Sequence, residues 1–119
     1  MKRALLLLAA VGAGLIPASA QAREPAYVQV VEKEWSLVLS RPRVRSGSVI
    51  VEAVNFGMDA HNVALRKAVS GARTVHLPTI GHGSHVDRTL RLTPGRYTLW
   101  CALPGHRARG MVVTLVVTR

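Results

Sequence analysis

The most informative stretch of this 119-residue chain is YTLWCALPGHRARGM, from Tyr97 to Met111. It contains the spacing C-x4-H-x4-M, formed by Cys101, His106 and Met111. Cys101 is the only cysteine of the chain, which excludes an intramolecular disulfide framework and any zinc site built from several cysteines. An unpaired thiol therefore needs another explanation, either as a metal ligand or as a small buried apolar group.

Strand alternation predicts where the side chains of this stretch point. Tyr97, Leu99 and Cys101 share the inward face of a strand, and Trp100 faces outward. The Pro104-Gly105 turn then swings the chain over the end of that strand and presents the next histidine. Met111 begins the following strand and points inward beneath the same end, although an apolar residue at this place could also simply be packed.

A second histidine, His61, lies 40 residues before the cysteine in the run NFGMDAHNVAL. A thiolate, two imidazoles and a weak thioether form the ligand set of a blue-copper electron-transfer centre. The sulfur ligands are soft and favour Cu(I), whereas imidazole accepts both Cu(I) and Cu(II), so such a site changes little on oxidation and reduction. Met58, three residues before His61, is a poor rival for the thioether role.

The rest of the chain alternates short apolar runs with turn signals. The expected strands are 27–39, 49–54, 61–65, 86–92, 97–101 and 111–118, with turns at 43–47 and 93–96 and an irregular segment at 66–83. Short strands at this density in about 100 residues predict an antiparallel Greek-key β-sandwich. No segment after the N-terminal region shows a helical period.

Residues 1–22 are predicted to be a cleaved signal peptide, and residues 23–119 a single domain. Lys2 and Arg3 precede an apolar run at 4–16, and small-x-small sites allow cleavage after Ala20 or Ala22. A membrane anchor is the alternative, but the run is shorter than the roughly 20 residues of a span. We therefore expect a secreted, periplasmic protein of a bacterial envelope with no membrane span.

The chain is strongly basic. Its formal net charge is +10, and removal of residues 1–22 with Lys2 and Arg3 lowers that to +8. Because the expected location is outside the cytoplasm, nucleic acid is excluded as a partner. An anionic partner protein or envelope surface is expected instead, although the scattered basic residues equally fit a solvated surface.

Four motifs carry a resemblance to the cupredoxin family, the small type 1 blue-copper proteins of the plastocyanin, azurin and auracyanin kind. They are V-N-F-G at 54–57, H-N-V at 61–63, P-G-R-Y at 94–97 and C-x-x-P-G-H-x-x-x-G-M at 101–111. The resemblance implies one copper ion held equatorially by His61, Cys101 and His106 and axially by Met111. It also implies that Asn62 ties the two ligand loops together by hydrogen bonds.

The departures from the family concern the surface of the site. Four residues separate Cys101 from His106, two more than in plastocyanin. Arg107 follows His106 directly, and Arg109 lies two residues further on. The exposed edge of His106, where electrons are expected to enter and leave, would then lie in a basic ring. Trp100 offers a second electron route, or it is an ordinary surface aromatic.

Three further histidines, His76, His82 and His85, are close together in the sequence. They could form an accessory metal site, but a glycine-rich loop is poorly preorganised for one. If the strand at 86–92 starts where the strand at 97–101 ends, His82 and His85 lie at the copper end. There they could modulate docking or its pH dependence.

The function expected from these residues is one-electron transfer by a monomeric, non-enzymatic copper protein. Its partners are expected to be redox proteins with acidic docking surfaces. Two alternatives stay open: a copper-binding or copper-delivery protein of the same fold, and a metal-free secreted β-sandwich that acts as an interaction module.

Overall fold

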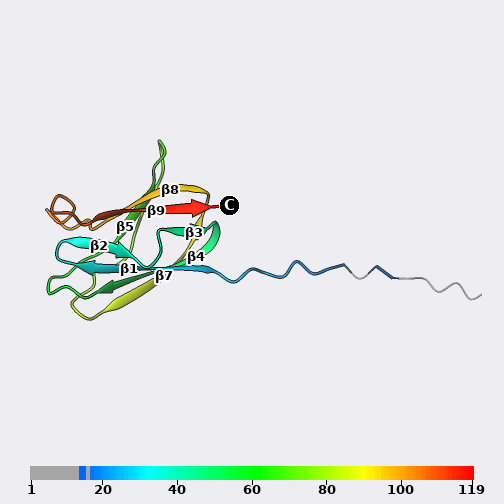
Figure 1. Ribbon diagram of the computed structural model, residues 1–119, viewed down its shortest axis with the longest axis horizontal. Helices are drawn as coiled ribbons and strands as arrows, with labels where there is room; N and C mark the ends of the chain where they lie inside the picture. Colours follow the sequence, from blue (N-terminus) through cyan, green and yellow to red (C-terminus); the bar gives the residue numbers. More distant parts are fainter. Residues whose placement is uncertain (1–13, 16) are drawn as a thin grey trace, which may run out of the picture.

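The computed structural model describes residues 14–15 and 17–119 and contains two β-sheets packed face to face (Figure 1). The strands are β1 (Ala26–Lys33), β2 (Ser36–Leu39), β3 (Arg43–Arg45), β4 (Gly47–Asn55), β5 (Ala64–Lys67), β6 (Thr74–His76), β7 (His85–Leu92), β8 (Gly95–Trp100) and β9 (Val112–Thr118). Most of the predicted apolar run at 4–16 lies outside the described residues. Within the described part of the chain, no helix is long and apolar enough to cross a membrane.

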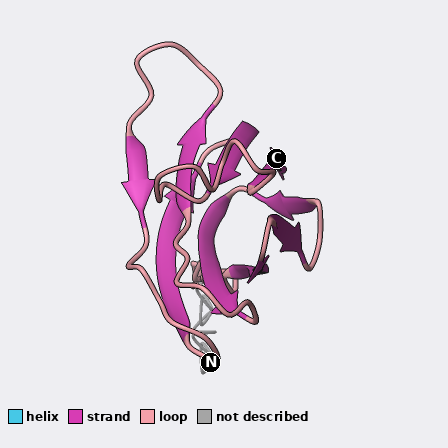
Figure 2. Ribbon diagram, turned by 90° about the vertical axis from the view of Figure 1, so that its left-hand side faces the viewer, coloured by secondary structure: helices cyan, strands magenta, loops and turns pink. Residues whose placement is uncertain are grey.

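The strand order is β2-β1-β4-β7 in one sheet and β3-β9-β8-β5-β6 in the other. Figure 2 shows the two layers and the loops that cross between them. The sandwich expected from the sequence is confirmed. Two strand pairs, β1 with β4 and β3 with β9, are parallel rather than antiparallel. Neither pair is consecutive in the chain, so neither is joined by a hairpin.

Alternating apolar residues fill the space between the sheets. Those that are fully buried include Val28, Val30, Val49, Val51, Leu99 and Leu115. Burying each such side chain contributes about 1.5–3 kcal/mol. Cys101 continues the buried face of Tyr97 and Leu99, whereas Trp100 is only half-buried, as the alternation predicts.

The expected single strand at 27–39 is wrong, because it is a hairpin. Lys33 pairs with Ser36, so the chain reverses at Glu34 and Trp35, and β1 and β2 lie antiparallel. The buried positions change from even-numbered residues in β1 to odd-numbered residues in β2, but the run at 27–39 contains no glycine or proline that would mark the turn. This turn lies close to the predicted ligands, as described below.

Two segments expected to be irregular also form strands. Residues 43–45, predicted as a turn, are β3 and pair with the end of β9, and residues 74–76 are β6 and pair with β5. The strand expected at 61–65 begins only at Ala64, and His61 forms an isolated bridge to Ile80 instead. The partners of these segments are distant in sequence, so no local pattern marks them.

Glu32, near the end of β1, is a buried carboxylate inside the sandwich. Its side chain is 0% exposed, and within the described residues neither carboxylate oxygen has a hydrogen-bond partner. Burial disfavours the charged form and raises the pKa of Glu32 to about 7. The folded protein therefore holds a proton on Glu32 over a pH range in which the unfolded chain has released it.

We predict that Glu32→Gln changes how stability depends on pH. Relative to the variant, the wild type loses about 3 kcal/mol of unfolding free energy as the pH rises. The loss begins above the ordinary pKa of 4.5 and is complete above about 7. Urea unfolding of the two metal-free proteins across this range measures the difference, and parallel pH profiles would contradict the prediction.

Candidate metal centre

Cys101 lies directly after β8, at one end of the sandwich. Its thiol is fully buried, and its backbone N–H donates a hydrogen bond to the carbonyl of Met111 at 3.0 Å. This bond continues the pairing of β8 with β9 by one residue and holds the start and end of the 101–111 segment together. The segment thus closes as a compact loop over the end of the sheet.

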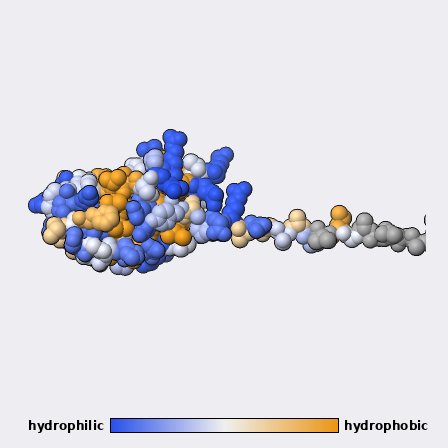
Figure 3. All heavy atoms as spheres, turned by 60° about the horizontal axis from the view of Figure 1, so that its bottom comes forward, coloured by the Kyte–Doolittle hydropathy of each residue, from blue (hydrophilic) through white to orange (hydrophobic). Residues whose placement is uncertain are grey.

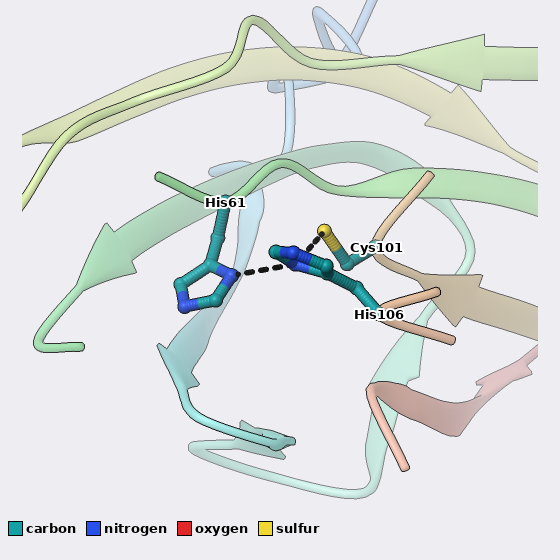
Figure 4. Close-up of side chains that lie close together, drawn as sticks. All are labelled: His61, Cys101 and His106. Atoms are coloured by element: carbon teal, nitrogen blue, oxygen red, sulfur yellow. Dashed lines mark hydrogen bonds between the residues drawn. The ribbon is translucent and has the colours of Figure 1, made fainter. Parts of the chain in front are cut away.

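His61 reaches the same end from the connection between β4 and β5. Its N–H donates to the carbonyl of Ile80 at 3.1 Å, and its own carbonyl accepts from the N–H of Ile80 at 2.8 Å. The side chain is 0% exposed. Figure 4 shows its ring directed at His106, with the two Nδ1 atoms 3.1 Å apart.

His106 lies in the loop between β8 and β9 and is half-buried. Its Nδ1 is 3.5 Å from Sγ of Cys101 (Figure 4). The potential donor atoms of His61, Cys101 and His106 all lie within 4.8 Å of one another. Over residues 14–15 and 17–119, this is the one group of three or more His, Cys, Asp or Glu side chains so arranged.

The donor set fits copper. Two imidazole nitrogens and one sulfur converge from three points of the chain, and the Nδ1 atoms of His61 and His106 face each other. Thiolate with imidazole is the combination that suits copper in both oxidation states. The site therefore has the chemistry that the sequence predicts for it.

Met111 immediately precedes β9 and is 0% exposed. Its N–H donates to the carbonyl of His106 at 3.2 Å, and its carbonyl accepts from Cys101, so its backbone touches both neighbouring residues of the site. Met58, by contrast, is 76% exposed. Of the two methionines near the site, only Met111 belongs to the core beneath it.

Asn62 links the two segments that carry the donor atoms. Its side-chain oxygen accepts a hydrogen bond from the N–H of Ala102 at 2.8 Å, and its own N–H points to Sγ of Cys101 at 3.5 Å. Its amide also donates to Thr79 at 3.0 Å. This contact matches the role that the family resemblance implies.

Glu34, which the sequence analysis did not single out, contacts the site from the β1–β2 turn. Its Oε1 is 2.7 Å from Nε2 of His61, on the ring edge opposite the donor cluster. The carboxylate also accepts the N–H groups of Asp59 at 2.8 Å and Met58 at 3.0 Å. These backbone hydrogen bonds, followed by that of His61, lower the pKa of Glu34 to about 2.

Trp35, the other residue of this turn, also escaped the sequence analysis. Its ring centroid lies 4.9 Å from that of His106 and 6.2 Å from that of His61, edge to face in both cases. The turn thus covers the two imidazoles from one side. No local signal reveals Glu34 and Trp35, because they lie inside a run that reads as an uninterrupted strand.

Two arginines lie over aromatic rings beside the site. The guanidinium of Arg109 is 4.4 Å from the centroid of Trp35, and that of Arg107 is 4.7 Å from the centroid of Trp100. These distances are those of cation–π contacts. The predicted basic surroundings of His106 are therefore present, in an ordered arrangement.

The histidines His76, His82 and His85 do not assemble into a group. His76 pairs with Ala64 in the sheet, and His85 pairs with Val54 at the start of β7. Nδ1 of His82 is 2.7 Å from the carbonyl of Gly57, in the segment between β4 and His61. The accessory metal site is therefore not formed, while His82 does lie toward the end that carries the donor cluster.

Comparisons with known proteins agree with this geometry. A family profile described as copper-binding proteins of the plastocyanin/azurin family matches residues 28–118. No match to a curated protein sequence was found.

Several solved structures resemble the chain. Reduced auracyanin from Roseiflexus castenholzii has a TM-score of 0.65 at 17% identity, covering 82% of this chain and 100% of its own. Auracyanin A from Chloroflexus aurantiacus has a TM-score of 0.64 at 17% identity, covering 80% and 100%. A reduced point mutant of amicyanin has a TM-score of 0.55 at 20% identity, covering 84% and 89%.

At these identities the solved structures establish the fold, and the profile match establishes the family. Together with the converging imidazole and thiol groups, they indicate one type 1 copper ion as the cofactor. The chain belongs to the plastocyanin/azurin family of copper-binding proteins, the cupredoxin family that its motifs indicate.

Proposed function

We propose that this protein is a one-electron carrier that binds a single type 1 copper ion through His61, Cys101 and His106, with Met111 as the axial ligand. The observation that carries the proposal is the convergence of two imidazoles and a thiol within 4.8 Å at one end of a cupredoxin fold. When bound, the copper supplies a centre that alternates between Cu(I) and Cu(II).

The residues around the donor atoms support fast electron transfer by keeping the site rigid. Cys101 and Met111 are joined through their backbones, Asn62 connects the His61 segment to the loop after Cys101, and His61 is bridged to Ile80. When the ligands cannot move toward the geometry that either oxidation state prefers, their positions change little as the copper gains or loses an electron. Electron transfer then meets little resistance from reorganisation of the site. The same rigidity argues against a copper-delivery protein, in which the ligands must release the ion.

Full burial of Cys101 and His61 supports a carrier rather than an enzyme. A substrate has no direct access to these two side chains, whereas an electron can leave through the half-buried ring of His106. Trp100, next to Cys101 in the chain, offers a second path to the surface. Trp100 lies under Arg107, and Trp35, which packs edge to face against His106, lies under Arg109.

We propose that the redox partner presents acidic side chains to this surface. A cavity of about 380 Å³ beside Trp100 is lined by three basic residues, Arg66, Lys67 and Arg107, and contains no acidic residue in its wall. On the face shown in Figure 3, apolar and hydrophilic side chains are interspersed. Phe56 and Met58, which are 56% and 76% exposed, add apolar area near His61.

The proposed location follows from the N-terminal sequence. Residues 1–22 would act as a signal peptide and be removed, which leaves residues 23–119 as the copper-binding domain in the bacterial envelope. The basic lining of the cavity beside Trp100 fits an anionic partner, and the location outside the cytoplasm favours a protein over a nucleic acid. We expect the domain to work as a monomer.

The absorption spectrum tests the copper centre. Residues 23–119 with one equivalent of Cu(II) should show an intense thiolate-to-copper charge-transfer band that disappears on reduction. Cys101→Ala should abolish the band and weaken copper binding. A colourless wild type would refute the carrier, and so would equal copper binding by wild type and variant, because Cys101 would then not be a ligand.

The axial role of Met111 is tested by Met111→Leu. The band should remain, and the reduction potential should rise, because a weak donor to the copper is removed. A tenfold loss of Cu(II) affinity relative to Cu(I) corresponds to about 60 mV for one electron. Voltammetry measures the shift, and an unchanged potential would show that Met111 does not act on the copper.

The basic surface is tested by replacing Arg107 and Arg109 together with glutamine. Reduction by an anionic metal complex should slow severalfold at low ionic strength, and reaction with a cationic complex should quicken. The difference should shrink in about 1 M salt, where the Debye length is about 3 Å. Replacing Arg43 and Arg45 of β3 together with glutamine, at the opposite end of the sheet, is the control matched in charge. Equal effects of both double replacements would contradict the assignment.

A further inference from the structure

We propose that Glu34 is a positioning residue of the metal centre, holding His61 in the tautomer that leaves Nδ1 free and favouring Cu(II) over Cu(I). The inference rests on the proposed function for the role of His61 as a ligand. The juxtaposition itself, a carboxylate 2.7 Å from the far nitrogen of a buried histidine in the donor cluster, is a property of this chain.

The two nitrogens of His61 face different groups. Nδ1 lies 3.1 Å from Nδ1 of His106, inside the donor cluster, and Nε2 lies 2.7 Å from Oε1 of Glu34. A neutral imidazole has one N–H, and an ionised carboxylate can only accept a hydrogen bond. The proton therefore belongs on Nε2, and the lone pair of Nδ1 is directed toward His106 and Cys101.

The Glu34 carboxylate is itself fixed in place. Its Oε1 accepts the N–H of Asp59 at 2.8 Å, and its Oε2 accepts the N–H of Met58 at 3.0 Å. Both donors belong to the segment that leads directly into His61. The β1–β2 turn and this segment are thus joined to each other through one side chain, so the carboxylate orients both the ring and the backbone that carries it.

Gly57 makes room for this carboxylate. A Cβ at residue 57 would collide with Oε1 of Glu34 and lie only 2.8 Å from its Cδ. The N–H of Gly57 is held by the carbonyl of Glu32 at 3.2 Å and by Oδ1 of Asn55 at 2.8 Å, so the backbone cannot easily move away. Any side chain at this position would displace the carboxylate from His61.

A negative charge hydrogen-bonded to a ligand histidine raises the basicity of that ligand. The more basic ring stabilises the higher positive charge of Cu(II) more than that of Cu(I). Loss of such an outer partner typically lowers metal affinity about 10- to 100-fold. If only the affinity for Cu(II) falls, each tenfold decrease in that affinity raises the reduction potential by about 59 mV.

Three variants remove or displace the carboxylate in different ways. Glu34→Gln removes the charge but keeps an acceptor oxygen, Glu34→Ala removes both, and Gly57→Ala keeps the charge but displaces it. Glu52→Gln is the control, because Glu52 contacts Gln29 and Tyr27 on the β1–β4 surface and its loss changes the net charge equally.

All three variants should raise the reduction potential, with Cu(II) affinity reduced about 10-fold and Cu(I) affinity little changed. Glu52→Gln should leave both affinities unchanged. In the metal-free protein, ¹⁵N NMR of the imidazole rings should show His61 protonated at Nε2 in the wild type. In Glu34→Ala this proton should exchange faster, and the other tautomer should become populated.

Potentials equal to that of Glu52→Gln, with an unaltered His61 ring signal in Glu34→Ala, would overturn the inference. The NMR readout needs no copper, so it distinguishes this failure from failure of the proposed function. A wild type that lacks the charge-transfer band but shows the Nε2-protonated His61 would refute the carrier and leave the Glu34–His61 contact standing. If Glu34→Ala does not fold, Glu34→Gln and Gly57→Ala give the potential readout.

Discussion

The register between β5 and β8 is the constraint on which the metal centre depends. Ala64 lies opposite Trp100, so the residues just before Ala64 lie beside the residues just after Trp100. Cys101 and His61, 40 residues apart in the sequence, are thereby brought to the same end of the sandwich. A slip of one residue would turn the Cys101 thiol to the outer face of the sheet, and no donor cluster would form.

Contacts around the donor cluster hold the neighbouring segments in place. Asn62 joins the chain before β5 to the chain after β8, and the pairing of Cys101 with Met111 closes the loop that contains His106. The β1–β2 turn then covers the imidazoles with Trp35 and holds His61 through Glu34. The donor atoms are thus oriented by segments from both sheets, which explains how an end of a small sandwich can be rigid.

Much of the site could be predicted from the sequence, because much of it is local. Cys101, His106 and Met111 belong to one strand–loop–strand segment, and period-two alternation correctly placed Cys101 inward and Trp100 outward. His61 was found because its residue type and spacing resemble a known family. The sandwich class followed from the number of short strands, although the parallel pairing of β1 with β4 did not.

The features that could not be predicted depend on contacts between distant segments. Glu34 and Trp35 lie within a continuous β-forming run, and only tertiary packing shows that the chain reverses there. Arg43–Arg45 becomes a strand because β9 offers a free edge, not because of its own residues. Glu32 shares the buried face of β1 with Val28 and Val30, whereas its charged side chain alone would predict an exposed position. Its carboxylate has no hydrogen-bond partner among the described residues.

Copper K-edge X-ray absorption on residues 23–119 with one equivalent of copper, recorded in both oxidation states, shows directly whether a rigid thiolate and imidazole copper centre forms. We predict one sulfur and two imidazole nitrogens as close neighbours of the metal, with little change in their distances on reduction. A centre surrounded only by nitrogen and oxygen, or one whose neighbours rearrange between Cu(II) and Cu(I), would contradict it.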